Sequence, residues 1–330
     1  MKFKHVIGMD MAKETYVVHV HHSDYTQEFI NAPKHICKML KTLEGKLKCS
    51  LDQCLFCLEH TGLYSLDMIM ILDSQSLNYS VIPGLEIKKS LGITRGKSDV
   101  IDAFKISEFG YLRQDKLTLH QMPSKALIKL KNLLSLRSMH VRHKASYQAR
   151  MKEQFTVLKK THFPDLYQSQ RRMIDHLSKE IERIENAIKE IVNQDLTMKK
   201  CNDLLISIKG IGEIVAAHMI VKTQCFLNFN DWRKFSCYCG TAPFPNESGS
   251  MVKARRISKI GDSEMKTLLT LSARSAMMHD PEIKLFCKRK LDLGKSKKNI
   301  TNCVRNKLIA RMFAVVKRGT PYVTMKKFAS

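Results

Sequence analysis

Four acidic residues stand in sequence contexts where carboxylates can do chemistry. Asp10 ends the apolar run HVIGMD, and Glu59 ends a second apolar run, CLFCLE. Asp99 and Asp102 lie three positions apart in KSDVIDA, so on a helix their side chains share one face. If the two strand ends lie side by side, all four carboxylates converge and repel one another unless a cation compensates them. The pattern therefore predicts a site for a hard divalent ion, Mg²⁺ or Mn²⁺.

Such a site suits phosphodiester chemistry, because two ions about 3.5–4 Å apart can hold both the attacking and the leaving oxygen. Each acid also has an ordinary structural explanation. Asp10 could cap a turn, Glu59 could pair with a lysine, and Asp99 could help to cap a helix that begins at Ser98. Their combination, in this order along the chain, favours the metal site.

The charge balance predicts a polyanionic partner. The chain of 330 residues has 56 Lys and Arg against 31 Asp and Glu, which gives a formal net charge of +25. The basic excess is concentrated in residues 251–330, where phosphates of DNA are the expected contacts. The candidate nucleic-acid-binding residues are Lys253, Arg255, Arg256, Lys259, Lys266, Lys288, Arg289, Lys297 and Lys298.

A membrane surface is the competing polyanion. The apolar stretches of the sequence fall far short of the roughly 20 residues that span a bilayer. The N-terminal segment MKFKHVIGMDMAK also has no apolar core typical of a secretory signal. We therefore expect no membrane association, and a protein of the bacterial cytoplasm that is associated with the nucleoid.

The elements around the acids predict an α/β region over residues 1–115. The β-branched runs HVIGMD and TYVVHVHH predict two antiparallel strands, and EFINA predicts a third. A helix (HICKMLKTLEG), a strand (CLFCLEH), a helix (YSLDMIMILDSQ), a strand (NYSVIPG) and a helix from Ser98 follow. The order βββαβαβα predicts a mixed sheet with helices on its faces.

Two further regions are expected to be helical. In residues 116–198, two long helices should meet near Pro164, and a heptad seam predicts either a coiled coil between copies of the chain or a hairpin packed on its own chain. The seam consists of Leu177, Ile181, Ile184, Ile188 and Ile191. Residues 199–330 should be mainly helical, with Gly210 and Gly212 in a turn that either faces a DNA backbone or joins two helices.

Several of these segments closely resemble a known family. GMDMAKE, LEHTG and KSDVIDA, followed by GIGEIVA and GTAPFPNESGSMVKARRISKIGDSEMKTLL, are similar to motifs of the DEDD transposases of the insertion-sequence one-ten family. The Piv-type DNA invertases are relatives of that family. The resemblance runs along nearly the whole chain and is least distinctive in the helical middle. Met265 and Lys266 depart from it, because the family has leucine and arginine there, and lysine lacks the bidentate fork of arginine.

The resemblance implies a fold and a mechanism. The first region would have the RNase H-like fold of the Holliday-junction resolvase RuvC, and its metal ligands would be Asp10, Glu59, Asp99 and Asp102. In the C-terminal transposase domain, Ser248 of NESGS would attack DNA and become covalently attached to it, with Ser250 as the neighbouring alternative. Family members are guided by a structured bridge RNA, and we expect a dimer or tetramer that holds two DNA duplexes.

We therefore expect a transposase that exchanges DNA strands through a phosphoserine intermediate. Two other functions stay open at this point. A RuvC-like junction resolvase that uses water would need only the acids and would leave the NESGS segment unexplained. A non-catalytic nucleic-acid-binding protein would need neither the acids nor the serine. The three differ in their products, which are protein-linked ends, free ends and none.

Overall fold

The chain divides into two compact units, Met1–Met122 and Pro123–Ser330. The computed structural model describes residues 3–59, 62–90, 92, 96, 98–158, 163–248 and 251–323, with the backbone alone for 246–248 and 251–256. Within these ranges no helix is both long enough and apolar enough to cross a bilayer.

The first unit is a mixed α/β fold built on a five-stranded sheet. Its strands are β1 (His5–Met11), β2 (Thr15–Val20), β3 (Thr26–Ile30), β4 (Cys54–Glu59) and β5 (Asn78–Ile82), in the spatial order β3-β2-β1-β4-β5. β1, β2 and β3 pair antiparallel, whereas β4 pairs parallel with both β1 and β5. The predicted order βββαβαβα is confirmed, and the first and fourth strands are neighbours.

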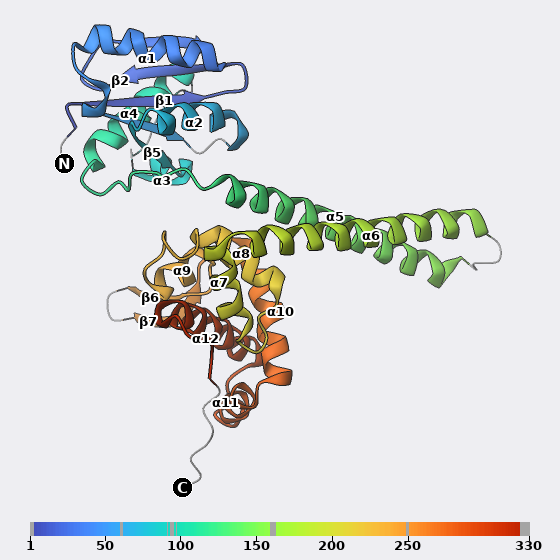
Figure 1. Ribbon diagram of the computed structural model, residues 1–330. Coiled ribbons are helices and arrows are strands. Elements are labelled where there is room, and N and C mark those ends of the chain that lie inside the picture. Colours follow the sequence, from blue (N-terminus) through green and yellow to red (C-terminus); the bar gives the residue numbers. More distant parts are fainter. Residues whose placement is uncertain are drawn as a thin grey trace. The chain divides into compact units, whose positions relative to one another are not determined.

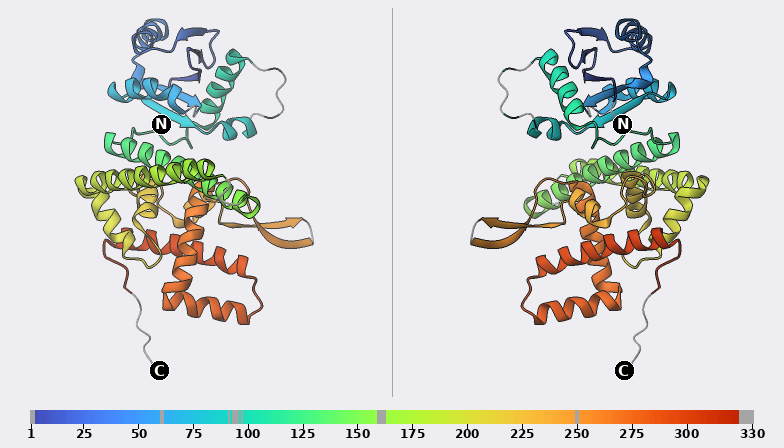
Figure 2. Two further views of the ribbon diagram at one scale, coloured as in Figure 1. Left: turned by 90° about the vertical axis from the view of Figure 1, so that its right-hand side faces the viewer. Right: turned by 90° about the vertical axis from the view of Figure 1, so that its left-hand side faces the viewer.

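In the described part of this unit, four helices accompany the sheet. They are α1 (Pro33–Leu47), α2 (Leu66–Ser74), α3 (Gly84–Ser90) and α4 (Asp99–Arg113), with 3-10 turns at Leu51–Gln53 and Gly62–Ser65. Because side chains alternate along a strand, Ile7 and Met9 share one core with α1 and α2, while Val6 and Leu55 share a second core with α3 and α4. α1 and α4 therefore cover opposite faces of the sheet (Figure 2). The short helix α3 was not predicted.

Helix α4 packs directly on the backbone of β1 because two contact positions lack a side chain. A Cβ at Gly8 would collide with the carbonyl oxygen of Ala103 and the amide nitrogen of Ser107. A Cβ at Gly110 would lie 2.8 Å from Cγ1 of Val6. The start of α4 thus lies beside the end of β1, and its end lies beside the start of β1. The two elements run in opposite directions.

The second unit begins with two long helices, α5 (Lys125–Val157) and α6 (Pro164–Gln194), which pack side by side as a hairpin (Figure 1). Pro164 begins α6, which confirms the predicted boundary, since proline suits the first helical position. The heptad residues Ile184 and Ile188 are buried with Leu130 and Leu134 of α5. This part of the seam therefore packs within the chain, as in the hairpin alternative.

The rest of the second unit is a helical core with one small sheet. Its helices are α7 (Leu196–Ile206), α8 (Glu213–Thr223), α9 (Trp232–Tyr238), α10 (Ser263–His279), α11 (Pro281–Asp292) and α12 (Lys297–Arg318). Gly210, with a φ of +95°, lies in the α7–α8 turn, and a Cβ there would lie 2.9 Å from the Cβ of Ala276 in α10. Packing against α10 therefore explains Gly210 without a DNA contact, whereas Gly212 is exposed with open space around it.

An antiparallel hairpin of β6 (Pro243–Ser248) and β7 (Met251–Ile257) interrupts these helices and projects from them (Figure 2). The sequence predicts a mainly helical region here and does not predict this hairpin. The segment PFPNES has no strand-like alternation, and its extended form comes from hydrogen bonds to β7.

Substitution of Gly8 by alanine should destabilise the first unit. Its methyl group would meet backbone atoms of α4, which cannot rotate away, so we expect a loss of about 1–3 kcal/mol in the free energy of unfolding. Urea denaturation measures the change. Gly45→Ala in α1 is the matched control, because nothing lies within 4 Å of its Cβ position. Equal stability of the Gly8→Ala and wild-type proteins would contradict the close packing of α4.

Candidate functional site

Asp10 and Glu59 lie at neighbouring strand ends. In the parallel pair of β1 and β4, Met9 is opposite Leu58, so the next positions bring Asp10 beside Glu59. Both side chains are half-buried, and strand alternation places them on the face that α4 covers, as for Gly8 and Cys57. Adjacent strands are about 4.8 Å apart, so two carboxylates here share one small region.

The other two acids lie in the first turn of α4, at the same end of the sheet. Asp99 is the first helical residue and is exposed, after Ser98, whose side chain caps the helix by accepting a hydrogen bond from the Ile101 amide. Asp102 is half-buried and forms an ion pair with Lys105, with 3.1 Å between Oδ1 and Nζ. Because α4 runs opposite to β1, its first turn faces the strand end that carries Asp10.

The four acids belong to elements that meet at one end of the sheet, but they do not form a closed cluster among the described residues. Among the described residues, no three His, Cys, Asp or Glu side chains lie close enough to hold one ion. The donor set consists only of hard oxygen ligands, which fits a divalent metal such as Mg²⁺ or Mn²⁺. The pair Asp10 and Glu59 meets the requirement for adjacent donors, and the α4 acids would have to come closer to join them.

Gly84, at the start of α3, is a residue that the sequence analysis missed. A Cβ at this position would lie 2.7 Å from the carboxyl carbon Cδ of Glu59 and would collide with its Oε1. The carboxylate of Glu59 thus lies against the bare backbone of Gly84. The only signal in the sequence was the dipeptide Pro83-Gly84 after a strand, which also marks an ordinary turn.

Ser248 is the last residue of β6, and its backbone is opposite Met251 of β7. Its side chain, and Ser250 altogether, lie outside the described residues. The base of this hairpin is fixed at Thr241, whose carbonyl oxygen accepts hydrogen bonds from Asn302 Nδ2 at 2.9 Å and Asn306 Nδ2 at 3.1 Å, both from α12. The Thr241 hydroxyl donates a further bond to Asn306 Oδ1 at 3.0 Å.

Asp262 fixes the chain on the other side of the hairpin. Its carboxylate caps α10 through the Met265 amide at 2.8 Å, pairs with Lys222 Nζ at 2.7 Å and accepts a bond from the Tyr238 hydroxyl at 3.0 Å. Burial alone would raise the pKa of Asp262, but the Lys222 ammonium and these donors hold that pKa below its ordinary value. The neighbouring His218 is buried, which lowers its pKa to about 4 and keeps it neutral near pH 7.

The predicted basic residues occupy three settings. Those that are exposed are Lys259, Lys288, Arg289, Lys297 and Lys298, and Lys266 is half-buried in α10. Lys253, Arg255 and Arg256 lie on β7, where the structure describes the backbone alone. Lys297 and Lys298 form the first turn of α12, after the capping residue Ser296. Exposure leaves these lysines available to phosphates.

The contact between Glu59 and Gly84 can be tested by a double-mutant cycle. Gly84→Ala should lower the free energy of unfolding by about 1–3 kcal/mol, because its methyl group displaces the Glu59 carboxylate. In a Glu59→Ala background the same change should cost nothing, since the space is free. The coupling energy from urea denaturation measures this. Additive effects of the two substitutions would contradict the contact.

Comparisons with known proteins agree with the family resemblance that the sequence motifs show. Residues 7–164 match a family model described as a transposase, that of the DEDD transposases of IS110, and residues 202–288 match the transposase IS116/IS110/IS902 family. The pilin gene-inverting proteins of Moraxella bovis and Moraxella lacunata are each 28% identical over 270 residues, which is 80% of this chain and 80% of theirs. An IS110 insertion-element protein of Streptomyces coelicolor is 25% identical over 136 residues, 41% of this chain and 34% of its own length. Since two models of one family match successive parts of it, the chain belongs to the IS110 family of transposases.

Proposed function

We propose that this protein cleaves and rejoins DNA strands of a mobile element through a phosphoserine intermediate, with Ser248 as the nucleophile. Membership of the IS110 family makes it a DNA transposase or recombinase, and the DEDD type suggests a divalent metal. The name of its Moraxella relatives describes inversion of a pilin gene, which is also a DNA rearrangement. The serine, the identity of the metal and guidance by RNA are the parts that we add.

The observation that carries the proposal is the register of β1 and β4. It brings Asp10 beside Glu59, on the face where the first turn of α4 carries Asp99 and Asp102. Three antiparallel strands followed by two parallel ones also agree with the proposed RNase H-like fold. An acidic group of this kind is unexpected in a chain of net charge +25 unless it has a function.

We assign the metal to these four acids. A divalent ion bound there would polarise the scissile phosphate and offset the negative charge that develops on it. The protein positions the ligands: β1 and β4 carry Asp10 and Glu59, and Gly84 leaves room for the Glu59 carboxylate. Asp102 also forms an ion pair with Lys105 through its Oδ1 atom.

In the proposed reaction the Ser248 hydroxyl attacks a backbone phosphorus atom. The new bond joins the serine oxygen to phosphorus, the bond to the 3′ oxygen breaks, and the serine proton is transferred through solvent to that leaving oxygen. The free 3′-hydroxyl of one strand then attacks the phosphoserine of its partner strand and restores the serine. Each cleavage exchanges one phosphodiester for another, so strand exchange needs no ATP.

The remaining assignments follow the same family. Residues 1–115 would contribute the metal site, residues 116–198 a helical spacer, and residues 199–330 the serine and the basic surface. A structured RNA of the element would select the DNA by base pairing, and a dimer or tetramer would hold two duplexes. The reaction would take place in the bacterial cytoplasm, at the nucleoid.

Substitution of the serine tests the nucleophile. Wild type should form a covalent protein–DNA adduct with labelled element-end DNA, flanking non-coding RNA and Mg²⁺, whereas Ser248→Ala should form none. Denaturing protein gels resolve the adduct. Ser250→Ala is the matched control and should keep it. Full trapping by Ser248→Ala would overturn the assignment, and free nicked ends from both proteins would indicate a resolvase that uses water.

Substitution of the acids tests the metal site. Glu59→Gln and Asp99→Asn should each lower the rate of strand cleavage by about 100-fold or more, because each removes a charge that holds the ion. DNA binding, measured by fluorescence anisotropy, should be largely unchanged. Near-wild-type cleavage by Glu59→Gln would contradict the role of this site.

The basic surface makes a separate prediction on salt. Because each neutralised duplex phosphate contributes about −0.9 to the log–log slope of affinity against salt, the double variant Lys297→Gln/Lys298→Gln should reduce the slope by about 2. Filter binding or anisotropy across a salt series measures it. An unchanged slope would show that these two exposed lysines do not contact phosphates.

A further inference from the structure

A cavity in the second unit has no role in the function described above. It has a volume of about 770 Å³ and lies between the α8–α9 connection and α12. Four aromatic side chains contribute to its wall: Phe226, Phe229, Trp232 and Phe313. Its size falls in the range of small-molecule pockets, about 300–1,000 Å³.

The rings of the aromatic wall pack against one another and against a buried ring. Phe226 and Phe313 meet edge to face, with ring centroids 4.9 Å apart, and Phe229 meets the buried Phe235 at 5.1 Å. Trp232 and Phe229 are half-buried, so part of each ring stays accessible. A planar ligand could therefore stack here on faces that already exist.

Charged and polar groups stand beside these rings. The Arg233 guanidinium lies over the Trp232 ring, 4.8 Å from its centroid, and Lys317 lines the cavity from α12. Both cations are exposed. Asn230 and Asp231 add an amide and a carboxylate, although the Asp231 carboxylate already accepts the Arg233 amide hydrogen bond at 3.0 Å. Cations, aromatic faces and an amide together match a nucleotide.

The backbone that carries Phe226 is held in an unfavourable conformation. Gln224, Cys225 and Phe226 have φ values of 47°, 55° and 68°, in the left-handed region that non-glycine residues rarely adopt. Buried Thr223 fixes this turn, since its hydroxyl accepts the Phe226 amide hydrogen bond at 2.9 Å. Strained backbone of this kind is often retained where a ligand is held.

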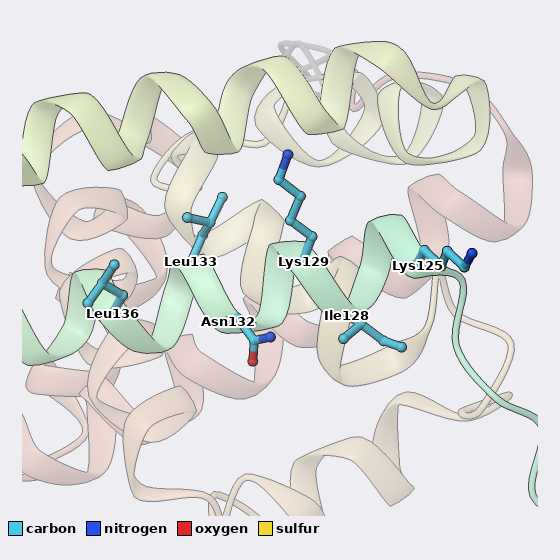
Figure 3. Close-up of a pocket in the computed structure, with 6 residues that line it drawn as sticks. All are labelled: Lys125, Ile128, Lys129, Asn132, Leu133 and Leu136. Carbon is cyan, nitrogen blue, oxygen red and sulfur yellow. The ribbon is translucent and has the colours of Figure 1, made fainter. Parts of the chain in front are cut away.

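A second hollow differs from the aromatic cavity in its lining. A groove of about 370 Å³ runs along the first turns of α5, and the described residues that line it all belong to that helix (Figure 3). Lys129 and Leu133 point to one side of the helix and Ile128 and Asn132 to the other. It has lysines but no aromatic ring, so it offers phosphate contacts without a surface for a base.

We propose that the aromatic cavity binds an unpaired nucleotide of the nucleic acid that the protein handles. The base would stack on Phe229 and Trp232, its edge would meet Asn230, and its phosphate would pair with Arg233 and Lys317. The inference rests on the proposed function only in taking nucleic acid as the ligand. It needs neither the metal site nor Ser248.

Trp232 supplies the measurement, because it is the only tryptophan of the chain. Its fluorescence is followed while the full-length protein, with a chelator present, is titrated with a short single-stranded DNA, with an RNA of the same sequence, and with an abasic strand of equal phosphate number. A strand with bases should quench Trp232 and bind about tenfold more tightly than the abasic strand. Whichever of the DNA and the RNA shows the larger gain in affinity over the abasic strand is the occupant.

Two substitutions assign the binding to the cavity. Phe229→Leu keeps an apolar side chain but removes the ring. It should abolish the tighter binding of strands with bases and leave the affinity for the abasic strand unchanged. Arg233→Gln should weaken binding of every strand, whereas Lys234→Gln, an exposed neighbour outside the cavity, should have less effect. Thermal melts confirm that the variants are folded.

Two results would overturn the inference. Equal binding of abasic and base-containing strands would show that the cavity takes no base, and so would a base preference that survives Phe229→Leu in a folded protein. Duplex DNA is titrated in parallel by anisotropy. If the wild-type protein bound neither single strands nor duplex DNA, the proposed function would be contradicted as well. Duplex binding without a preference for bases would contradict only the inference on the cavity.

Discussion

The close approach of α4 to β1 is the constraint on which the candidate site depends. Because Gly8 and Gly110 have no side chains, the helix rests on the strand, and its direction is fixed by contacts at both positions. That direction brings the first turn of α4, with Asp99 and Asp102, to the strand end where Asp10 lies. A methyl group at Gly8 would push helix and strand apart, and the acids would separate with them.

In the second unit, buried and half-buried polar contacts fix the base of the hairpin that carries Ser248. The hairpin of β6 and β7 is anchored at its base by residues that the structure describes. There Thr241 is held by two asparagines of α12, and Asp262 is held by Lys222. Each bond is buried or half-buried, where an unpaired partner is costly. The hairpin therefore projects from a fixed base.

Ion pairs within the fold also affect the surface charge of the C-terminal segment. In the C-terminal segment, Asp262 and Asp280 cap helices and pair with a lysine or an arginine, and Glu264 and Glu282 also form internal ion pairs. These acids are neutralised within the fold, whereas many lysines of the segment are exposed. The outward face is thus more basic than the composition alone suggests, which favours contact with phosphates.

The order of elements in the first unit and the helix boundary at Pro164 could be predicted from the sequence, because apolar periodicity and strand ends are local patterns. The four acids stay a prediction for the metal site. The sequence did not reveal α3, the β6–β7 hairpin, the contact of Gly84 with Glu59 or the aromatic cavity. These depend on residues far apart in the chain: β6 is extended only because β7 pairs with it, and the cavity joins the α8–α9 connection to α12. Only the tertiary structure could decide them, since no local pattern records which distant atoms will share a space.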